Sequence, residues 1–483
     1  MANSSAVQDA GVGTVVKTDV PTRLDRLSWS PWHRRVVIAF GVTWVLDGLE
    51  AQLVGGLTPV LQRPETLHLD PTQAGMAQSI YLVGQVVGAL VFGRLTDQYG
   101  RKKLFLITLA LYLLATAFSG SAFTFPLFAF FRFFAGAGIG GEYAAINSAI
   151  DELIPARVRG QVDLVINGSY WLGVGVAGVF SDAILHMLPL SYGWRLVFGL
   201  GAVLGLVILL VRRNMPESPR WLLLHGRIGE ANAVMDSIEQ AAREQPGAVP
   251  DEPAPKVNIT VLGSTGFRHI ARVLLQQHRR RSVFGLVLMV CQAFFYNAIF
   301  FTYSMILRNF YNVPEDRVGR YIIPFAIGNL LGPILLGRLF DTIGRRRMIV
   351  WTYAMSGVTL VITGMLFVRG MLSPETQTLA WCIVFFFASP AASSAYLTVS
   401  ELFPVELRGM AISLFYSIST GASVIAPTFF AWLISSKQRS ALFNGYVFAS
   451  ALMVTAAVVA WFLAEDAEQK SLEQLANTDR LLD

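Results

Sequence analysis

Three charged residues interrupt long apolar stretches of this sequence, and their chemistry suggests proton handling. Asp47 and Glu50 lie three residues apart in one stretch, and Arg132 lies in another. An ionised side chain at the centre of a bilayer costs about 2.5 to 3.5 kcal/mol, so an acid kept there is a functional candidate unless it only pairs with a cation. At a spacing of three, Asp47 and Glu50 share one face of a helix. A carboxylate that takes up a proton releases a paired arginine, and this release can drive a change of conformation.

Two other roles stay open for Asp47 and Arg132: a static ion pair that holds two helices together, or direct binding of a substrate carboxylate by Arg132. Glu142 is a further candidate for proton coupling. It lies ten residues beyond Arg132, about 15 Å along a helix, so the two side chains cannot touch. The alternative for Glu142 is a helix-end acid whose side chain snorkels to the membrane interface.

A second set of residues offers hydrogen bonds and flat rings to a small solute. Amides provide paired donors and acceptors that suit hydroxyl groups, and aromatic rings stack on the apolar face of a sugar or an aromatic acid. The alternative is structural, because amides also join helices in membranes and Tyr or Trp anchor helices at the interface. The candidates for the substrate cavity are Gln292, Asn297, Tyr303, Tyr396, Asn167 and Trp171.

The composition indicates that these residues belong to a membrane protein. Of the 483 residues, 54% are hydrophobic and 14% are charged, and the mean hydropathy is +0.52. These values are too apolar for a soluble protein of this size, and twelve spans of about 20 residues would use roughly half the chain. The net charge of +6 comes from basic residues in predicted loops, which argues against nucleic-acid binding. Cys291 and Cys382 lie in apolar runs, so neither a disulfide framework nor a metal site is expected.

The apolar runs predict an all-α membrane protein with twelve transmembrane helices in two six-helix bundles. The expected order is a cytoplasmic tail at 1–34, a bundle at 35–212, a linker at 213–282 with an amphipathic helix near 229–243, a second bundle at 283–464 and a cytoplasmic tail at 465–483. Basic residues in the first half gather in the loops after the second and fourth spans, which places both termini in the cytoplasm. The second half is less asymmetric, because several basic residues fall in its outer loops: Arg308, Arg317, Arg320, Arg369, Lys437 and Arg439.

Two loop motifs occur once in each half, in register. GRLTDQYGRKK at 93–103 matches GRLFDTIGRRR at 337–347, and ELIP at 152–155 matches ELFP at 401–404. Their acids and arginines can form a latch that closes the cytoplasmic side and breaks when that side opens. The alternative is topology alone, in which basic residues only retain the loops inside. The predicted latch consists of Asp97, Arg101, Glu152, Arg159, Asp341, Arg345, Glu401 and Arg408.

These repeated motifs resemble those of the major facilitator superfamily over nearly the whole chain. Three further pieces resemble its sugar porter branch: RFFAGAGIG at 132–140, PESPRWL at 216–222, and Gln292 followed by NAIFFTY at 297–303. GGEY at 140–143 resembles metabolite–proton symporters and sialic-acid-type carriers, and DGLE at 47–50 resembles aromatic-acid symporters. By resemblance, Asp47 and Arg132 occupy the positions of the proton-coupling pair of sugar porters. Where that branch normally has a Trp in its tenth span, this chain has Tyr396.

These features predict a secondary transporter that moves a small polar organic solute, sugar-like or a small carboxylate, together with protons by alternating access. We expect no cofactor beyond protons as the coupling ion, and no phosphate loop, zinc spacing or nucleophile elbow suggests an enzyme. The expected partners are a small-molecule solute and the lipid bilayer, and no nucleic acid is expected. We expect a monomer in a bacterial inner membrane. The alternatives are a uniporter, proton-driven efflux of amphipathic organic ions, and a membrane solute sensor that transports nothing.

Overall fold

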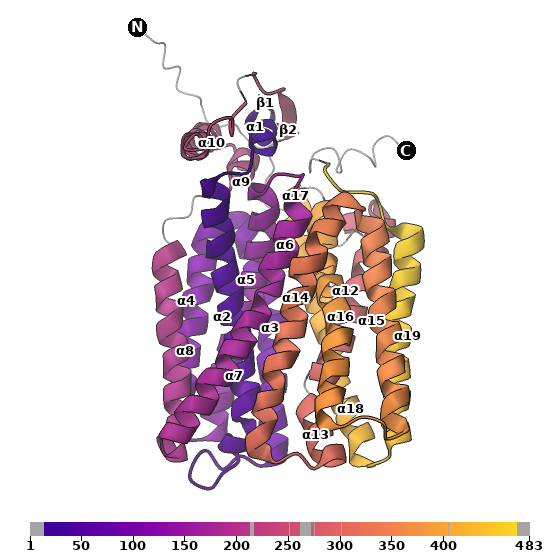
Figure 1. The fold of residues 1–483 in the computed structure, drawn as a ribbon. Helices are drawn as coiled ribbons and strands as arrows, with labels where there is room; N and C mark the ends of the chain where they lie inside the picture. Colours follow the sequence, from indigo (N-terminus) through magenta and orange to yellow (C-terminus); the bar gives the residue numbers. More distant parts are fainter. Residues whose placement is uncertain are drawn as a thin grey trace.

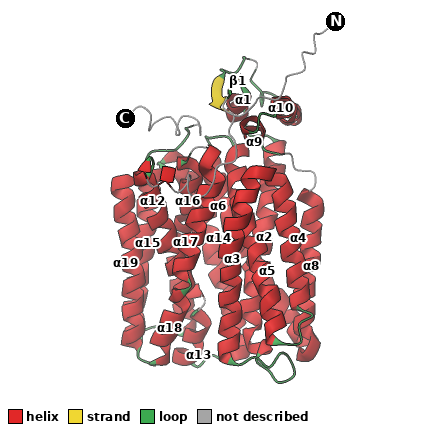
Figure 2. Cartoon of the chain, turned by 180° about the vertical axis from the view of Figure 1, so that it is seen from behind, coloured by secondary structure: helices red, strands yellow, loops and turns green. Residues whose placement is uncertain are grey.

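The computed structural model describes residues 14–212, 217–250, 252–260, 272–274, 276–300, 302–403 and 405–470. Long helices run side by side, and a small cap of short elements lies at one end of the molecule (Figures 1 and 2). We refer to this end as the capped end. The first half of the chain, indigo to magenta in Figure 1, contains α2 (Pro31–Leu61), α3 (Pro71–Tyr99), α4 (Arg101–Ser119), α5 (Phe125–Leu153), α6 (Arg159–Gly168), α7 (Tyr170–Met187) and α8 (Leu190–Arg212).

The second half, orange to yellow in Figure 1, forms a matching bundle beside the first. It contains α12 (Arg279–Phe300), α13 (Tyr303–Tyr311), α14 (Glu315–Thr342), α15 (Arg345–Val368), α16 (Pro374–Leu402), α17 (Val405–Ser423), α18 (Ile425–Ser435) and α19 (Arg439–Leu463). Across the boundary between the halves, α14 packs against α6 and α7, and α17 packs against α3 and α5.

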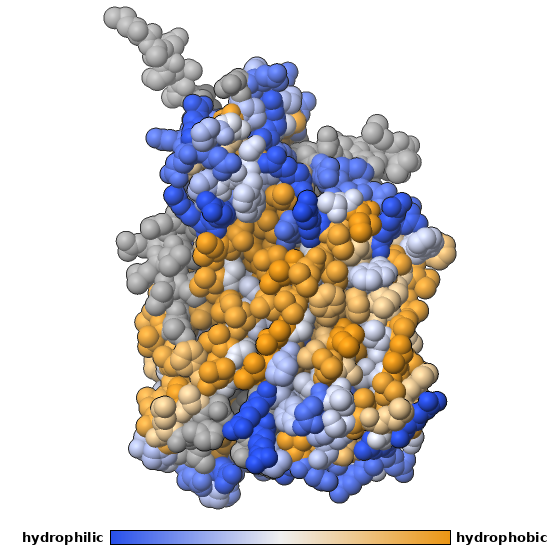
Figure 3. All heavy atoms as spheres, in the orientation of Figure 1, coloured by the Kyte–Doolittle hydropathy of each residue, from blue (hydrophilic) through white to orange (hydrophobic). Residues whose placement is uncertain are grey.

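Nine stretches of the described residues are long and apolar enough to cross a membrane. Helices α2, α5 and α8 are not part of these nine stretches but run beside them in the bundle, and they have 31, 29 and 23 residues. At 1.5 Å per residue each of the three is long enough for a hydrocarbon core of about 30 Å. An apolar band covers the bundle in Figure 3, with hydrophilic side chains at both ends. The chain is therefore an integral membrane protein with the all-α, two-bundle fold that the sequence predicts.

Three spans that the sequence predicts as single helices are each interrupted once. The breaks separate α6 from α7 at Ser169, α12 from α13 near Thr302, and α17 from α18 just after Ser423. At each break a hydroxyl donates to a backbone carbonyl three or four residues earlier: Ser169 to Ile166, Thr302 to Ala298 and Ser423 to Thr420. Such local hydrogen bonds compete with the helical ladder and bend helices, and hydropathy alone does not reveal them.

Glycines bring several helices into backbone contact. A Cβ at Gly140 would lie 2.0 Å from the carbonyl oxygen of Gln85, and a Cβ at Gly173 would lie 1.7 Å from that of Val45. At Gly175 the nearest atom is 3.7 Å away, which is ordinary contact. Small residues are therefore required where α5 meets α3 and where α7 meets α2, but not at every glycine of these helices.

The repeated loop motif has the same backbone conformation in both halves. Gly100 has φ +100° and ψ 154°, and Gly344 has φ +114° and ψ 149°. This region of backbone space is accessible essentially only to glycine. The two glycines are the N-cap residues of α4 and α15, so the sequence repeat corresponds to a structural repeat.

The cap joins the beginning of the chain to the linker between the halves. Its elements are β1 (Val15–Thr18), α1 (Val20–Arg26), α9 (Pro219–Leu224), α10 (Ile228–Ala242) and β2 (Val257–Thr260). Strands β1 and β2 pair antiparallel, from Val15 opposite Thr260 to Thr18 opposite Val257. Arg23 bridges Asp236 at 2.6 Å and Glu239 at 2.8 Å, and its hydrogen bond with Glu239 raises the pKa of this guanidinium. Residues 14–30, which the sequence analysis treats as part of a tail, are thus packed against the linker.

Candidate substrate cavity and ion-pair network

A cavity of about 190 Å³ lies between the two halves. Its walls contain no charged side chain among the residues that the structure describes. Neutral polar groups come from residues that include Gln78, Gln85, Asn167, Gln292, Asn297, Ser389, Ser393 and Ser423. Nine aromatic residues complete the walls: Trp44, Tyr81, Tyr143, Tyr170, Trp171, Tyr296, Phe300, Tyr396 and Tyr416. The described part of the site therefore offers rings and hydrogen bonds to a solute.

Most of the predicted substrate residues line this cavity, namely Gln292, Asn297, Tyr396, Asn167 and Trp171. Tyr303 is not part of the lining. Its ring stacks on Phe325 at 5.8 Å and meets Trp381 edge-on at 5.6 Å. The break before α13 separates Tyr303 from the regular course of α12, and a prediction from continuous helical spacing could not detect this.

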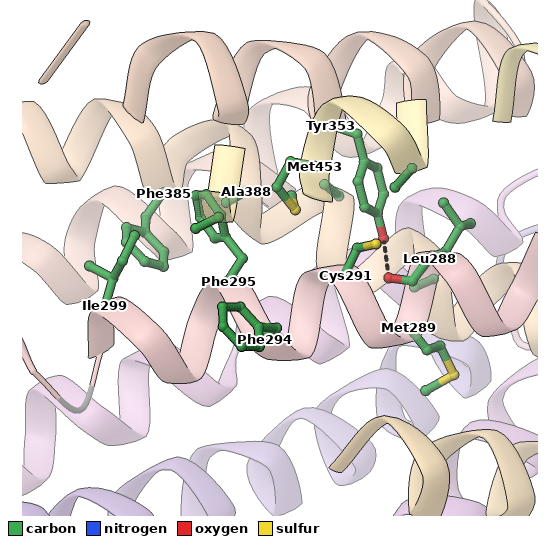
Figure 4. Packing of buried hydrophobic residues seen from close by; sticks show 14 of the residues in the cluster. Leu288, Met289, Cys291, Phe294, Phe295, Ile299, Tyr353, Phe385, Ala388 and Met453 are labelled. Carbon is green, nitrogen blue, oxygen red and sulfur yellow. Dashed lines mark hydrogen bonds between the residues drawn. The ribbon is translucent and has the colours of Figure 1, made fainter. Parts of the chain in front are cut away.

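Helix α12 has two faces with different tasks. Gln292 and Asn297 face the cavity, whereas Phe295 and its apolar neighbours pack into the second half (Figure 4). Behind them the hydroxyl of Tyr353 on α15 donates to the carbonyl oxygen of Leu288 at 3.1 Å. This packing fixes the orientation of α12, and so fixes where its two amides point.

Hydrogen bonds hold several cavity side chains in place. The Asn297 amide donates to the Ser423 hydroxyl at 2.6 Å, which links α12 to the end of α17. The Tyr296 hydroxyl donates to the Asn329 side-chain oxygen at 3.0 Å, which links α12 to α14. Polar groups held in this way need less ordering when a solute binds.

Three tyrosines join the halves at the cavity, and we call them the tyrosine cluster: Tyr143, Tyr396 and Tyr416. Tyr143 on α5 stacks on Tyr416 of α17, with ring centroids 4.7 Å apart and planes 26° apart. Tyr396 lies 6.0 Å from Tyr143. Of these three tyrosines, the sequence suggested only Tyr396 as a site residue, although Tyr143 follows Glu142 in the GGEY motif.

The predicted proton-coupling residues lie behind this aromatic wall. Asp47 is only 1% exposed and interacts electrostatically with Tyr143 and Tyr170, both of which line the cavity. Arg132 is fully buried, and its guanidinium lies over the ring of Tyr81 at 4.2 Å, an arrangement that favours a cation. A direct pair between Asp47 and Arg132 stays a prediction, and the Glu50 side chain lies outside the described residues.

Glu142 is fully buried on α5. A helix-end acid that snorkels to the interface would keep its carboxylate in contact with water, so this alternative does not fit the structure. Asp163 on α6, with 1% exposure, is a further buried acid that sequence reasoning missed. It lies four residues after Arg159, in a helix that the sequence analysis considered only for its loop motif and for Asn167.

An ion-pair network closes the capped end of the boundary between the halves. Arg345 binds both carboxylate oxygens of Glu401 at 3.0 Å and one oxygen of Asp341 at 2.7 Å. Asp341 also accepts from the backbone N–H groups of Gly160 at 3.2 Å and Gln161 at 2.7 Å, in the first turn of α6 in the other half. A carboxylate is favoured at a helix N-terminus, so Asp341 acts as an end cap supplied by the opposite bundle.

Arg159 completes the crossing, with a nitrogen 3.7 Å from a Glu401 oxygen. Asp25 of the cap lies 3.6 Å from Arg159 and 2.9 Å from Arg220. The Arg220 guanidinium also donates to the Glu152 carbonyl oxygen at 2.8 Å. The structure thus brings together Arg159, Asp341, Arg345 and Glu401 of the predicted latch and adds Asp25 and Arg220. The side chains of Asp97, Arg101 and Arg408 lie outside the described residues.

Two membrane-embedded bundles around a central cavity, with ion pairs that join them at one end, define a transporter. The chain belongs to the family described as "Sugar (and other) transporter", whose sequence model matches residues 49–477. The family consists of transporters, as the sequence predicts, and not of enzymes.

Relatives match over almost the whole chain. The niacin transporter NiaP of Acinetobacter baylyi is 24% identical over 467 residues, covering 95% of this chain and 99% of NiaP. The benzoate transport protein of the same organism is 22% identical over 433 residues, covering 86% and 87%. The structure of XylE, a proton:xylose symporter of the major facilitator superfamily from E. coli, bound to 6-bromo-6-deoxy-D-glucose, superposes with a TM-score of 0.74. That match has 19% identity and covers 92% of this chain and 98% of XylE. The predicted major facilitator fold is confirmed.

Proposed function

We propose that this transporter is a proton-coupled symporter of a small polar organic solute with a single six-membered ring, either sugar-like or a small carboxylate. The observation that carries the proposal is the position of Asp47, a buried acid directly behind the aromatic wall of the central cavity. An acid inside the membrane raises the free energy of the protein, so one that faces the interior of a bundle is a candidate for a proton relay.

The size of the cavity supports a one-ring solute. A cavity of about 150 Å³ holds one benzene molecule, and the central cavity measures about 190 Å³. One ring with one or two small polar substituents therefore fits this volume. The nine aromatic side chains suit the faces of such a ring, and the amides of Gln292 and Asn297 suit its substituents. NiaP and the benzoate transport protein are named for solutes of this size.

Protonation of Asp47 is the proposed link between the solute and the conformation. Asp47 lies within electrostatic range of Tyr143 and Tyr416, which stack across the boundary between the halves. We infer that uptake of a proton by Asp47, while the solute contacts these tyrosines, changes how the two halves pack. One proton moving down 100 mV supplies about 2.3 kcal/mol, and one pH unit adds about 1.4, which allows roughly 500-fold accumulation of a neutral solute.

The finer placement of the protein belongs to the same proposal. Both termini and the capped end face the cytoplasm of a bacterial inner membrane, in keeping with the basic loops of the first half. The protein acts as a monomer without cofactors, because a single chain supplies both walls of the cavity. No nucleic acid takes part.

Solute-driven proton uptake tests the proposal. Right-side-out vesicles are given a panel of hexoses, pentoses, polyols, and pyridine and benzene carboxylates, and external alkalinisation is recorded. The proposal expects one class of these solutes to bring protons in. If no solute moves protons but a labelled one equilibrates, the protein is a uniporter and Asp47 is structural.

A specific observation favours one second candidate, proton-driven efflux of amphipathic organic cations. The described lining contains nine aromatic residues and no charged side chain, and aromatic faces attract desolvated cations. The same vesicles separate the two functions. An organic cation that leaves the vesicles against its own gradient only when the outside is more acidic than the inside would support efflux, and proton entry with a neutral or acidic solute would support symport.

A further inference from the structure

A second cavity, of about 390 Å³, lies where the first turns of α14 meet the first turns of α16. These turns lie at the end opposite the cap (Figure 1). The cavity is separate from the central one and has no lining residue in common with it. Arg317, Arg320 and Tyr321 contribute from α14, and Glu375 and Cys382 contribute from α16.

Two arginines lie at the outer rim of the cavity. Arg317 and Arg320 are exposed and lie three residues apart, so both point to one face of α14. No ion pair joins either guanidinium to a carboxylate whose side chain the structure describes. Glu375, the one acid of the lining, already accepts from the Tyr321 hydroxyl at 2.9 Å and from the Ser373 hydroxyl at 2.8 Å. Among the described lining residues, two arginines therefore outnumber the single carboxylate, which already accepts two hydrogen bonds.

An apolar path continues from the rim towards the membrane centre. Ile327 and Leu331 on α14 are 51% and 41% exposed, and Leu379 and Ile383 on α16 are 60% and 49% exposed. In Figure 3 hydrophilic side chains at the lower end of α14 border the apolar band directly. A ligand that satisfies both parts must carry an anionic head and a long apolar chain.

This arrangement also gives a role to two of the basic residues that loop retention leaves unexplained, Arg317 and Arg320. Basic residues gather at the end opposite the termini in the second half, although retention of loops in the cytoplasm favours them at the other end. Arginines at headgroup depth instead attract anionic lipids, at about 1 kcal/mol for each cation near the surface.

We propose that this seam binds one anionic phospholipid of the bilayer, with its phosphate between Arg317 and Arg320 and an acyl chain along Ile327 and Ile383. The leaflet concerned is the outer one under the orientation given above, and the site itself does not depend on the transported solute. Two cationic contacts of about 1 kcal/mol each correspond to a preference of about 30-fold for an anionic over a zwitterionic phospholipid, at 1.4 kcal/mol per tenfold.

Cys382 is a native reporter of occupancy. It lies in the cavity wall, and its thiol donates to the carbonyl oxygen of Pro324 at 3.2 Å. The other cysteine, Cys291, is buried and is replaced by alanine in the test protein. The rate of alkylation of Cys382 by N-ethylmaleimide is measured in nanodiscs of phosphatidylcholine, with and without added phosphatidylglycerol. The proposal expects slower alkylation with phosphatidylglycerol, with half of the effect reached at a small molar fraction of that lipid.

Three double variants assign the effect to the site. R317Q/R320Q should lose the difference between the bilayers, and R317K/R320K should retain it. R369Q/K437Q removes two exposed positive charges from the same end of the molecule but outside the cavity, and should also retain it. Equal rates of Cys382 alkylation in both bilayers, in the protein with Arg317 and Arg320 intact, would overturn the proposal. A difference that survives in R317Q/R320Q would also overturn it. Inorganic phosphate is added to phosphatidylcholine nanodiscs as a further arm. Slower alkylation with phosphate alone would assign the site to a soluble anion and would also overturn the lipid assignment.

Discussion

Neutralising Asp341 should open the capped end of the transporter. The Asp341 carboxylate accepts from the N–H groups of Gly160 and Gln161 across the boundary between the halves, at 3.2 and 2.7 Å. A hydrogen bond to a charged group contributes about 1.5 to 3 kcal/mol. Asp341→Asn keeps one acceptor oxygen but loses the charge, so we take the loss as one to two bonds at the lower value. At 1.4 kcal/mol per tenfold, the ratio of closed to open molecules should fall by about 10- to 100-fold.

The change in the ratio of closed to open molecules is measurable by pulsed electron paramagnetic resonance. Spin labels are placed at exposed sites on the capped ends of α3 and α15, in a cysteine-free background, and the distance distribution is compared between variants. Asp341→Asn should shift weight to longer distances. Glu465→Gln is the matched control, because it breaks an ion pair of 2.8 Å with Arg281 that lies within the second half. Identical distributions for Asp341→Asn and the parent would refute the reasoning, as would an equal shift in the control.

Three more predictions follow from single contacts. Gly140→Ala should separate α3 from α5 and lower the thermal unfolding temperature of purified protein, because its Cβ would lie 2.0 Å from the Gln85 carbonyl oxygen; Gly175→Ala, with 3.7 Å of room, should leave that temperature unchanged. Asp25→Asn should raise protease sensitivity of the cap by weakening its ion pair of 2.9 Å, and unchanged cleavage would show that the strands alone hold the cap. Asn297→Leu should raise the KM of transport at least tenfold, since it removes an amide from the cavity, and an unchanged KM would remove it from the binding site.

Repeated motifs and the residues of a single helix could be predicted from the sequence alone. Gly100 and Gly344 were identified as equivalent by their motifs, and they share a backbone conformation that only glycine adopts readily. The amides of α12 were selected by their resemblance to a sugar porter motif, and both line the central cavity. Periodicity and repeated motifs carry this information because both follow from the geometry of one regular helix.

Features that depend on contacts between residues far apart in the sequence could not be predicted. The cap forms because β1 pairs with β2 more than 200 residues later, and neither short strand has a signal of its own. Asp25 gains its importance only from Arg159 and Arg220, which lie far along the chain. Tyr303 lies outside the lining of the central cavity, beyond the break where the Thr302 hydroxyl donates to the Ala298 carbonyl oxygen. In each case tertiary contacts decide the outcome, and a single sequence contains no direct record of them.

The central claim is that Asp47 carries the proton that drives accumulation. Uphill uptake of the labelled solute identified by the vesicle panel is measured in proteoliposomes with an alkaline interior. Exchange of external labelled solute for internal unlabelled solute is measured in solute-loaded proteoliposomes at equal pH, and the two rates are compared. Asp47→Asn should abolish uphill uptake while exchange continues at a comparable rate, because a neutral side chain mimics the protonated carrier in both directions. Uphill uptake by Asp47→Asn at the parent level would contradict the account.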